Sequence, residues 1–366
     1  ADLSSLDAAS RENALSAMEA AGFRWLRQRF PWDAIEPRRG EYNWATWDKL
    51  VEDVFRHNLS VIAVLDGSPA WARADVDTEN PLAPPVESRH FGDFAAAFVQ
   101  RYGDRIDYYQ VWDEPNIAPH WGAREIDPVA YAHLLREGAI RVRAADPGTT
   151  ILLAALAPNT EPGGANMSEL LFLDALYQQG AAEWFDVVAT QPYSFGEPVD
   201  APPDSERLNW QRLVLLRQVM ETHGDTEAAV WAVSFGLPAS DAVVEAVEQA
   251  RSDWSWLGPM LWAAWSPADA HGEYALTDEG AQSGPVYEAL QALANSPVVA
   301  WPGANPADHP SGRYEGDWRV TPSGADIGAS GDRLTIPFQG TRLDLTVRRG
   351  DYRAFLFVTI DGEPAN

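Results

Sequence analysis

The sequence of 366 residues contains no cysteine and only one lysine, Lys49, against 26 arginines. The lack of cysteine excludes disulfides, thiolate metal ligands and thiol nucleophiles. The single lysine falls in a predicted helix, which argues against a barrel enzyme that forms a Schiff base, such as an aldolase. No run of 18 apolar residues occurs, so we predict no membrane span. The first residues do not have the pattern of a signal peptide, and we expect a secreted or cell-surface protein whose leader is absent from this sequence.

Positive charge is scarce, and metal-binding patterns are missing. The formal net charge is −27, which disfavours nucleic acids and anionic membranes as partners because both are polyanions. An acidic surface also serves solubility alone. The seven histidines are scattered and none pair at the spacing of metal ligands. We therefore predict no metal site and no cofactor, and we expect a monomer.

Apolar runs alternate with amphipathic segments over the first 295 residues. The pattern predicts seven strands, at residues 23–30, 60–65, 106–114, 150–157, 185–190, 228–235 and 257–265. It also predicts eight helices, at residues 6–21, 44–57, 91–102, 128–145, 168–179, 206–223, 241–251 and 285–294. Continuous apolar strands separated by helices indicate a parallel sheet covered on both faces. A (β/α)8 TIM barrel fits best. An open doubly wound sheet is the alternative, but no glycine-rich phosphate loop follows any strand.

This count leaves the barrel one strand short. Either the first strand precedes residue 1, or the start of the chain is misassigned. From Ser296 the pattern changes, and prolines at 297, 302, 306 and 310 predict a linker at 296–313. Short alternating apolar runs over 314–366 then predict a small antiparallel β domain, which we expect to be truncated. The predicted domains are therefore a barrel at 1–295, the linker and the β domain.

Polar and aromatic side chains follow the predicted strands, where a parallel barrel places its active site. The most informative of these strand ends follows the strand at 106–114, which runs into Trp112-Asp113-Glu114-Pro115-Asn116. Four other strand ends carry Asp66-Gly67-Ser68, Gln191-Pro192-Tyr193, Ser234-Phe235-Gly236 and Trp265-Ser266. Each alone is as consistent with a strand cap as with a site. Five such ends at one edge favour a site.

Taken in order, these motifs resemble the retaining glycoside hydrolases of clan A, which include cellulases, β-xylosidases and β-glucosidases. The likeness covers residues 20–293. Residues 21–37, with Arg27 and Trp32, resemble the clan's second strand and its loop. Residues 112–116 resemble its Trp-Asn-Glu-Pro signature. Two later motifs also fit: residues 191–193 are similar to His-Pro-Tyr after the sixth strand, and residues 231–236 to Trp-x-x-Glu-Phe-Gly on the seventh. Trp265 falls where the clan keeps a sugar platform.

The resemblance implies a hydrolase of O-glycosidic bonds in a β-linked poly- or oligosaccharide, with Glu114 as general acid/base. Such an acid has to hold its proton near neutral pH, and Asp113 beside it would disfavour ionisation of Glu114. The alternative for Glu114 is a buried acid bonded to an arginine such as Arg27. The resemblance also implies a carbohydrate-binding set: Arg27, Trp32, Asp66, Trp112, Asp113, Asn116, Gln191, Tyr193 and Trp265. His120 and Trp121, in the loop after Glu114, either line the cleft or are plain surface.

Two residues depart from the clan's pattern. Ser234 stands at the position of the nucleophilic glutamate, and a serine without a base is a poor nucleophile. Asp113 stands where the clan has an asparagine that donates a hydrogen bond to the substrate, which an ionised aspartate does not do. Three explanations are open. The serine is an engineered replacement, or the protein is an inactive carbohydrate-binding relative. Otherwise another carboxylate acts on water in an inverting scheme, the candidates being Asp66, Asp269 and Glu273.

The predicted β domain resembles the jelly-roll modules that are attached to many carbohydrate enzymes. Residues 338–342 and 358–362 carry this likeness. Such modules either bind sugar or brace the barrel, and we favour bracing.

Overall fold

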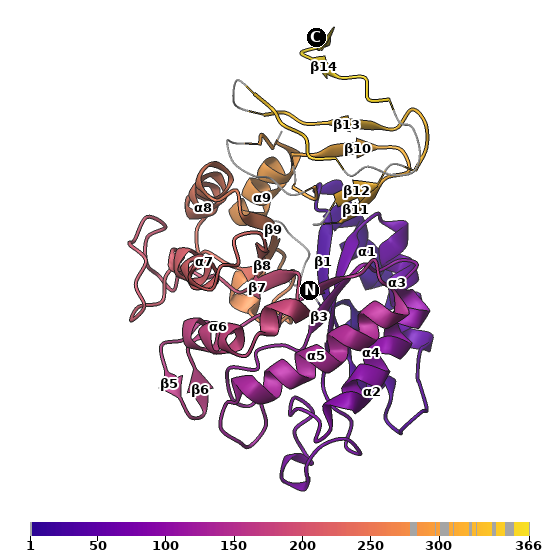
Figure 1. Ribbon diagram of the computed structural model, residues 1–366, viewed down its shortest axis with the longest axis vertical. Coiled ribbons are helices and arrows are strands. Elements are labelled where there is room, and N and C mark those ends of the chain that lie inside the picture. The colour runs from indigo at the N-terminus through magenta and orange to yellow at the C-terminus, as the bar shows by residue number, and fades with distance from the viewer. Residues whose placement is uncertain are drawn as a thin grey trace.

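The computed structural model describes residues 2–278, 284–296, 298–300, 307–309, 311–321, 324–326, 328–338, 342–347 and 355–365. At its centre is a seven-stranded sheet whose strand order follows the chain (Figure 1). Its strands are β1 (Trp25–Pro31), β2 (Ser60–Asp66), β3 (Tyr108–Val111), β4 (Thr150–Leu152), β7 (Val187–Thr190), β8 (Ala229–Phe235) and β9 (Leu257–Trp262). All neighbouring strands are parallel. The edge strands β1 and β9 approach each other, so the sheet curls into a barrel. The predicted TIM-barrel class is confirmed, because a doubly wound sheet would reverse its strand order.

Helices surround this sheet and cover its outer face. The long ones are α1 (Ala8–Ala20), α3 (Ala45–Arg56), α4 (Ser88–Tyr102), α5 (Pro128–Ala145), α6 (Glu169–Gln178), α7 (Arg212–Thr222), α8 (Ser240–Asp253) and α9 (Pro285–Asn295). Shorter turns are α2 (Trp32–Ile35), η1 (Leu3–Ser5), η2 (Asp75–Asp77), η3 (Ala181–Trp184) and η4 (Gly272–Tyr274). The start of α5 follows the sequence signals, since the Asp127 side chain accepts hydrogen bonds from the amides of Val129 and Ala130, and Pro128 occupies the first turn.

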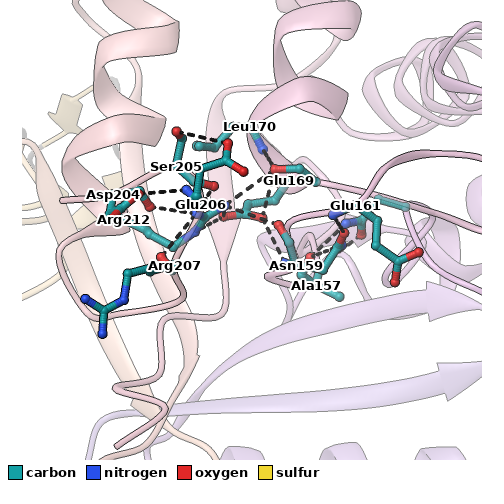
Figure 2. A network of polar contacts seen from close by, with 12 residues as sticks. Ala157, Asn159, Glu161, Glu169, Leu170, Asp204, Ser205, Glu206, Arg207 and Arg212 are labelled. Atoms are coloured by element: carbon teal, nitrogen blue, oxygen red, sulfur yellow. Dashed lines mark hydrogen bonds and ion pairs between the residues drawn. The ribbon is translucent and has the colours of Figure 1, made fainter. Parts of the chain in front are cut away.

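Helix α7 begins at Arg212 rather than at residue 206 as predicted. The reason is the Arg212 guanidinium, which donates hydrogen bonds to the backbone carbonyls of the preceding segment. It donates to the carbonyl oxygens of Asp204 (2.8 Å) and Ser205 (2.9 Å) and pairs with the buried carboxylate of Glu169 at 2.6 Å. Figure 2 shows this network joining the segment before α7 to α6 and to the loop after β4. A buried pair with every hydrogen bond satisfied fixes a loop that the sequence pattern assigns to a helix.

The interior of the barrel is filled by aromatic rings at the N-terminal ends of the strands. The rings of Trp25, Tyr108 and Trp231 have centroids 4.8–5.4 Å apart. Gly258 on β9 makes room for them, because a Cβ at this position would lie 2.4 Å from Nε1 of Trp231. We call this end, around Trp25, Tyr108 and Trp231, the floor. The other end we call the rim, which comprises the C-terminal strand ends and loops at residues 66–68, 112–120, 191–197, 234–236 and 263–275.

Short antiparallel strands follow the barrel and lie at its floor (Figure 1). They pair as β10 (Arg313–Glu315) with β13 (Arg333–Thr335), β11 (Arg319–Thr321) with β12 (Gly324–Asp326), and β14 (Thr359–Ile360) with β15 (Glu363–Pro364). The Tyr108 hydroxyl donates to the Val320 carbonyl (3.4 Å), and Arg319 lies 3.8 Å from Asp146. The predicted antiparallel region is therefore present. Its jelly-roll form and domain limits stay predictions, and the linker prolines at 297, 302, 306 and 310 lie outside the described residues.

One hairpin was not predicted: β5 (Pro162–Gly163) pairs with β6 (Asn166–Met167) in the loop after β4. None of the described helices is long and apolar enough to cross a membrane.

Candidate active site

The end of β3 carries the central site residue in an unusual backbone. The strand ends at Val111, three residues before the predicted end, because Trp112 and Glu114 adopt φ angles of 70° and 48°. Left-handed φ is strained for side chains of this size and is found mostly where the surroundings enforce it. Here the backbone amides of Trp112 and Glu114 donate to the carbonyls of Leu65 on β2 (2.9 Å) and of Ala155 after β4 (3.1 Å). The twist brings the Asp113 and Glu114 side chains to the rim together.

The two carboxylate oxygens of Glu114 contact different side chains, an amide and an imidazole. Gln191 Nε2 donates to Glu114 Oε1 (2.8 Å), and His120 Nε2 lies 3.3 Å from Glu114 Oε2. The Glu114 side chain is 17% exposed. Burial raises the pKa of Glu114, and the neighbouring Asp113 charge raises it further, whereas His120, Gln191 and Arg27 oppose the shift. Glu114 is thus a carboxyl that holds its proton to a higher pH than an ordinary glutamate, as a general acid requires.

Asp113 forms an ion pair beside this carboxyl. Arg27 Nη2 donates to Asp113 Oδ1 at 2.5 Å, and Gln110 Nε2 donates to the same oxygen at 3.0 Å. Arg27 Nε also donates to Gln110 Oε1 (3.0 Å), so side chains from β1, from β3 and from the segment after β3 form one network. The arginine predicted as a partner for Glu114 is therefore bonded to its neighbour. This network fixes Asp113 next to Glu114, whose pKa it raises.

Ser234 lies at the rim on β8, among aromatic side chains. Register irregularities between β8 and β9 occur here, and the Ser234 hydroxyl is 2.8 Å from the Tyr193 hydroxyl. Burial raises the pKa of Tyr193, so its phenol stays protonated and is not poised as a nucleophile. The Tyr193 ring stacks on Tyr274 at 5.4 Å. Gly236 makes this possible, since a Cβ there would lie 2.6 Å from the Tyr274 ring.

The three carboxylates considered as alternative bases lie in different surroundings. Asp66 is 3% exposed and binds Arg29 Nε through both oxygens at 2.7 and 2.8 Å. Burial raises the pKa of Asp66 to about 6 against the opposing effect of Arg29. Asp269 is a turn cap whose carboxylate accepts the backbone amides of Trp265, Ser266 and Asp2.

Glu273 is the most exposed of the three, with a side chain that is 63% exposed and 3.5 Å from His271. His271 in turn packs on Tyr193, with ring centroids 5.0 Å apart. Glu273 therefore lies on the loop that covers the Ser234 side of the rim.

Three of the residues predicted to contact carbohydrate have fully buried side chains. Trp32 and Asn116 are both 0% exposed. Trp32 falls in helix α2, where Nε1 donates to Glu36 (2.7 Å) and the ring stacks on Phe94. The Asn116 amide is used within the protein, since Nδ2 donates to the Ala157 and Met167 carbonyls and Oδ1 accepts from the Ala157 amide. These two side chains support the rim from below through contacts within the protein, and their part in binding carbohydrate stays a prediction.

Trp112 is the third of these residues, being 1% exposed and packed against Phe91 and Trp121. Its Nε1 donates to the His120 carbonyl (3.1 Å), which fixes the loop that carries the His120 ring. Trp265 is half-buried and meets Tyr287 of α9 edge-on at 6.2 Å. Its role as a sugar platform stays a prediction.

Of the two loop residues that the sequence leaves open, His120 reaches Glu114, whereas Trp121 is buried in the core. The structure adds two side chains that the motifs did not reveal. His271 and Tyr274 pack on Tyr193 from the loop after β9. Neither has a sequence signal beyond its place after a strand. Among the described residues, no group of three or more His, Asp or Glu side chains is placed to hold a metal ion.

Comparison with known proteins relates this barrel to sugar-cleaving enzymes. A family described as beta-galactosidase (glycoside hydrolase 42) matches residues 4–74. No curated protein matches by sequence. Among solved structures, a family 39 glycoside hydrolase from the gut symbiont Bacteroides cellulosilyticus superposes with a TM-score of 0.62 at 19% identity, covering 77% of this chain and 60% of that one. The chain has the fold of the barrel glycoside hydrolases.

Two further structures support this likeness. A glucosidase from Croceicoccus marinus has a TM-score of 0.57 at 15% identity, covering 76% of this chain and 62% of that chain. An endo-β-1,4-glucanase from Xanthomonas axonopodis pv. citri has a TM-score of 0.57 at 13% identity, covering 77% and 90%. The expected resemblance to clan A is thus confirmed at the level of the fold. The chain spans about three fifths of the length of the family 39 hydrolase and of the glucosidase.

Proposed function

We propose that this protein binds a β-linked oligo- or polysaccharide at the rim and that Glu114 acts there as the general acid of O-glycoside hydrolysis. The observation that carries the proposal is the surroundings of Glu114. A partly exposed carboxyl with a raised pKa lies at the end of a barrel strand, held by Gln191 at 2.8 Å. Glycosidase-like folds place this chemistry at the same end of the barrel.

Glu114 supplies the proton that the departing sugar oxygen needs. The C–O bond at the anomeric carbon breaks as positive charge develops on the ring, and the Glu114 proton passes to the leaving oxygen. A proton donor of this kind contributes about 10²–10⁴-fold to the rate. Water or a second carboxylate has to complete the reaction at the anomeric carbon.

A carbohydrate-binding protein without activity is the second candidate, and Ser234 favours it. The Ser234 hydroxyl is bonded to a phenol that stays protonated, so no base activates it. Of the alternative carboxylates, Asp66 and Asp269 are engaged with Arg29 and with backbone amides. Glu273 is the freest, and an inverting role for it would need a separation from Glu114 of about 6.5–9.5 Å.

The test is to supply the second carboxylate. We expect Ser234→Glu to raise the hydrolysis of aryl β-glycosides above that of the unmodified chain, and azide to raise turnover by the unmodified chain. Ser234→Gln is the matched control, since it has the same size without the charge. Adding Glu114→Gln to Ser234→Glu should remove the gain.

The outcomes separate the candidates. A Ser234→Glu variant that shows no hydrolysis but still binds oligosaccharides supports the second candidate, a carbohydrate-binding protein without activity. Activity that persists in Glu114→Gln contradicts the acid role of Glu114. Activity in the unmodified chain that is lost in Glu273→Gln supports the inverting scheme.

A further inference from the structure

Phe195 is an exposed aromatic residue at the rim, in the loop between β7 and α7. Its side chain is 47% exposed although its neighbour Ser194 is buried. The ring lies edge-on to Tyr193, with centroids 5.9 Å apart and an interplanar angle of 83°. Because the Tyr193 hydroxyl is 2.8 Å from the Ser234 hydroxyl, the Phe195 ring is separated from Ser234 by one side chain. Single exposed aromatics are ordinary, so its backbone and surroundings decide whether it has a role.

The backbone at Phe195 is in the left-handed region, with φ at 52°. A bulky side chain is rarely found there, and such strain persists where the surroundings enforce it, often at ligand sites. The conformation turns the chain outward after buried Ser194, and a turn bond from the Glu197 amide to the Ser194 carbonyl (3.0 Å) closes it. As a result an apolar ring faces solvent at the rim.

The loop that carries Phe195 is anchored at its far end. The Arg212 guanidinium donates to the carbonyls of Asp204 and Ser205, and Gln211 Nε2 donates to the Val199 carbonyl (2.8 Å). Glu169 holds Arg212 from the opposite side at 2.6 Å. In Figure 2 the Arg207 side chain points away from this network. A preorganised loop loses little entropy when it binds a ligand.

The same loop carries an ion pair, and one of its members lies two positions after Phe195 in the sequence. Arg207 Nη2 donates to Glu197 Oε1 at 2.6 Å, and both side chains are partly exposed. Sugars offer an apolar C–H face together with hydroxyls that donate and accept hydrogen bonds. An exposed ring and a guanidinium–carboxylate pair match these two features, as binding sites combine aromatic surface with a few polar groups.

We propose that Phe195, with Glu197 and Arg207, forms a second sugar-binding position beside the proposed site at Glu114, so that the ligand is an oligosaccharide of more than one unit. This inference rests on the proposed function of the rim. A sugar chain bound at Glu114 would continue over Phe195 to the loop anchored by Arg212.

The experiment is calorimetric titration of the full chain with gluco- and manno-oligosaccharides of increasing length, from the monosaccharide upward. We expect Phe195→Ala to weaken binding of the longer sugars about tenfold while leaving the monosaccharide unchanged. Phe195→Tyr, which keeps the ring, should bind the longer sugars as the unmodified chain does. The matched control is Phe55→Ala on α3, a phenylalanine that is 57% exposed and far from the rim, and it should bind like the unmodified chain.

A further variant distinguishes a loss of binding from a loss of stability. Asparagine tolerates left-handed φ, so Phe195→Asn should melt at or above the temperature of the unmodified chain and still lose affinity for the longer sugars. If Phe195→Ala and Phe195→Asn bind every length as the unmodified chain does, the second position is refuted and the proposed function stands. If no sugar of any length binds the unmodified chain, the proposed function fails first.

Discussion

The two ends of the barrel differ although the same strands build them. On β1 the inward side chains change from Trp25 at the floor to Arg27 and Arg29 at the rim, and on β3 from Tyr108 to Gln110. The floor is closed by stacked rings, whereas the rim carries ion pairs, strained residues and partly exposed carboxyls. One strand therefore contributes packing at one end and chemistry at the other. Substitutions at the floor should cost stability, and those at the rim should change protonation or binding.

The largest expected effect is at the floor. Trp231 is 0% exposed and touches both Trp25 and Tyr108. We expect Trp231→Ala to lower the free energy of unfolding by about 3–5 kcal/mol, because it removes buried apolar surface and leaves a cavity. Urea denaturation measures the loss, with Phe55→Ala as the control. A loss no greater than that of the control would contradict the assigned role of the floor.

The next effect is a pH dependence at the rim. The pKa of Asp66 is about 6 in the folded state and 3.8 is its ordinary value. The folded protein therefore keeps this proton while the unfolded chain releases it, and stability falls between about pH 4 and pH 6, by up to about 3 kcal/mol. Asp66→Asn should flatten this part of the pH–stability curve. An unchanged difference between pH 4 and pH 7 would show that Asp66 does not cause it.

A smaller loss is expected from crowding the floor. Gly258→Ala places a methyl group 2.4 Å from Nε1 of Trp231. Because the rings around it are close-packed, we expect a loss of about 1–3 kcal/mol in the free energy of unfolding. The double variant Gly258→Ala with Trp231→Phe should recover part of this loss. If it does not, the crowding arises elsewhere.

The smallest effect concerns the proton on Glu114. A charged His120 lowers the pKa of Glu114, so His120→Gln should raise the pKa of Glu114 further without lowering the melting temperature. Carbon NMR of the glutamate carboxyls, titrated against pH, measures it, with Glu114→Gln to assign the signal. A Glu114 resonance that titrates identically in both proteins would remove His120 from the site.

The barrel could be predicted because long apolar strands and their helices leave a strong pattern in the sequence. The rim could be predicted only in part. Motifs located Glu114 at a strand end, but nothing in the sequence shows that Trp112 and Glu114 take left-handed φ angles and end β3 at Val111. Trp32 and Asn116 lie within motifs that predict ligand contacts. Their side chains point into the protein, and a motif does not record orientation.

Long-range contacts explain the remaining differences. Arg212 reads as an ordinary helix residue in the sequence, yet its pairing with Glu169 across 43 positions moves the start of α7. Phe195 belongs to no periodic pattern, and only its exposure and φ angle distinguish it. Such features depend on which loops meet in space.

The antiparallel strands β10 to β13 dock beneath Tyr108, at the end of the barrel away from Glu114. A tag or solid support attached through this side would leave the mouth facing solution. The molecule could then be immobilised on a sensor surface with its rim loops unobstructed, in one uniform orientation.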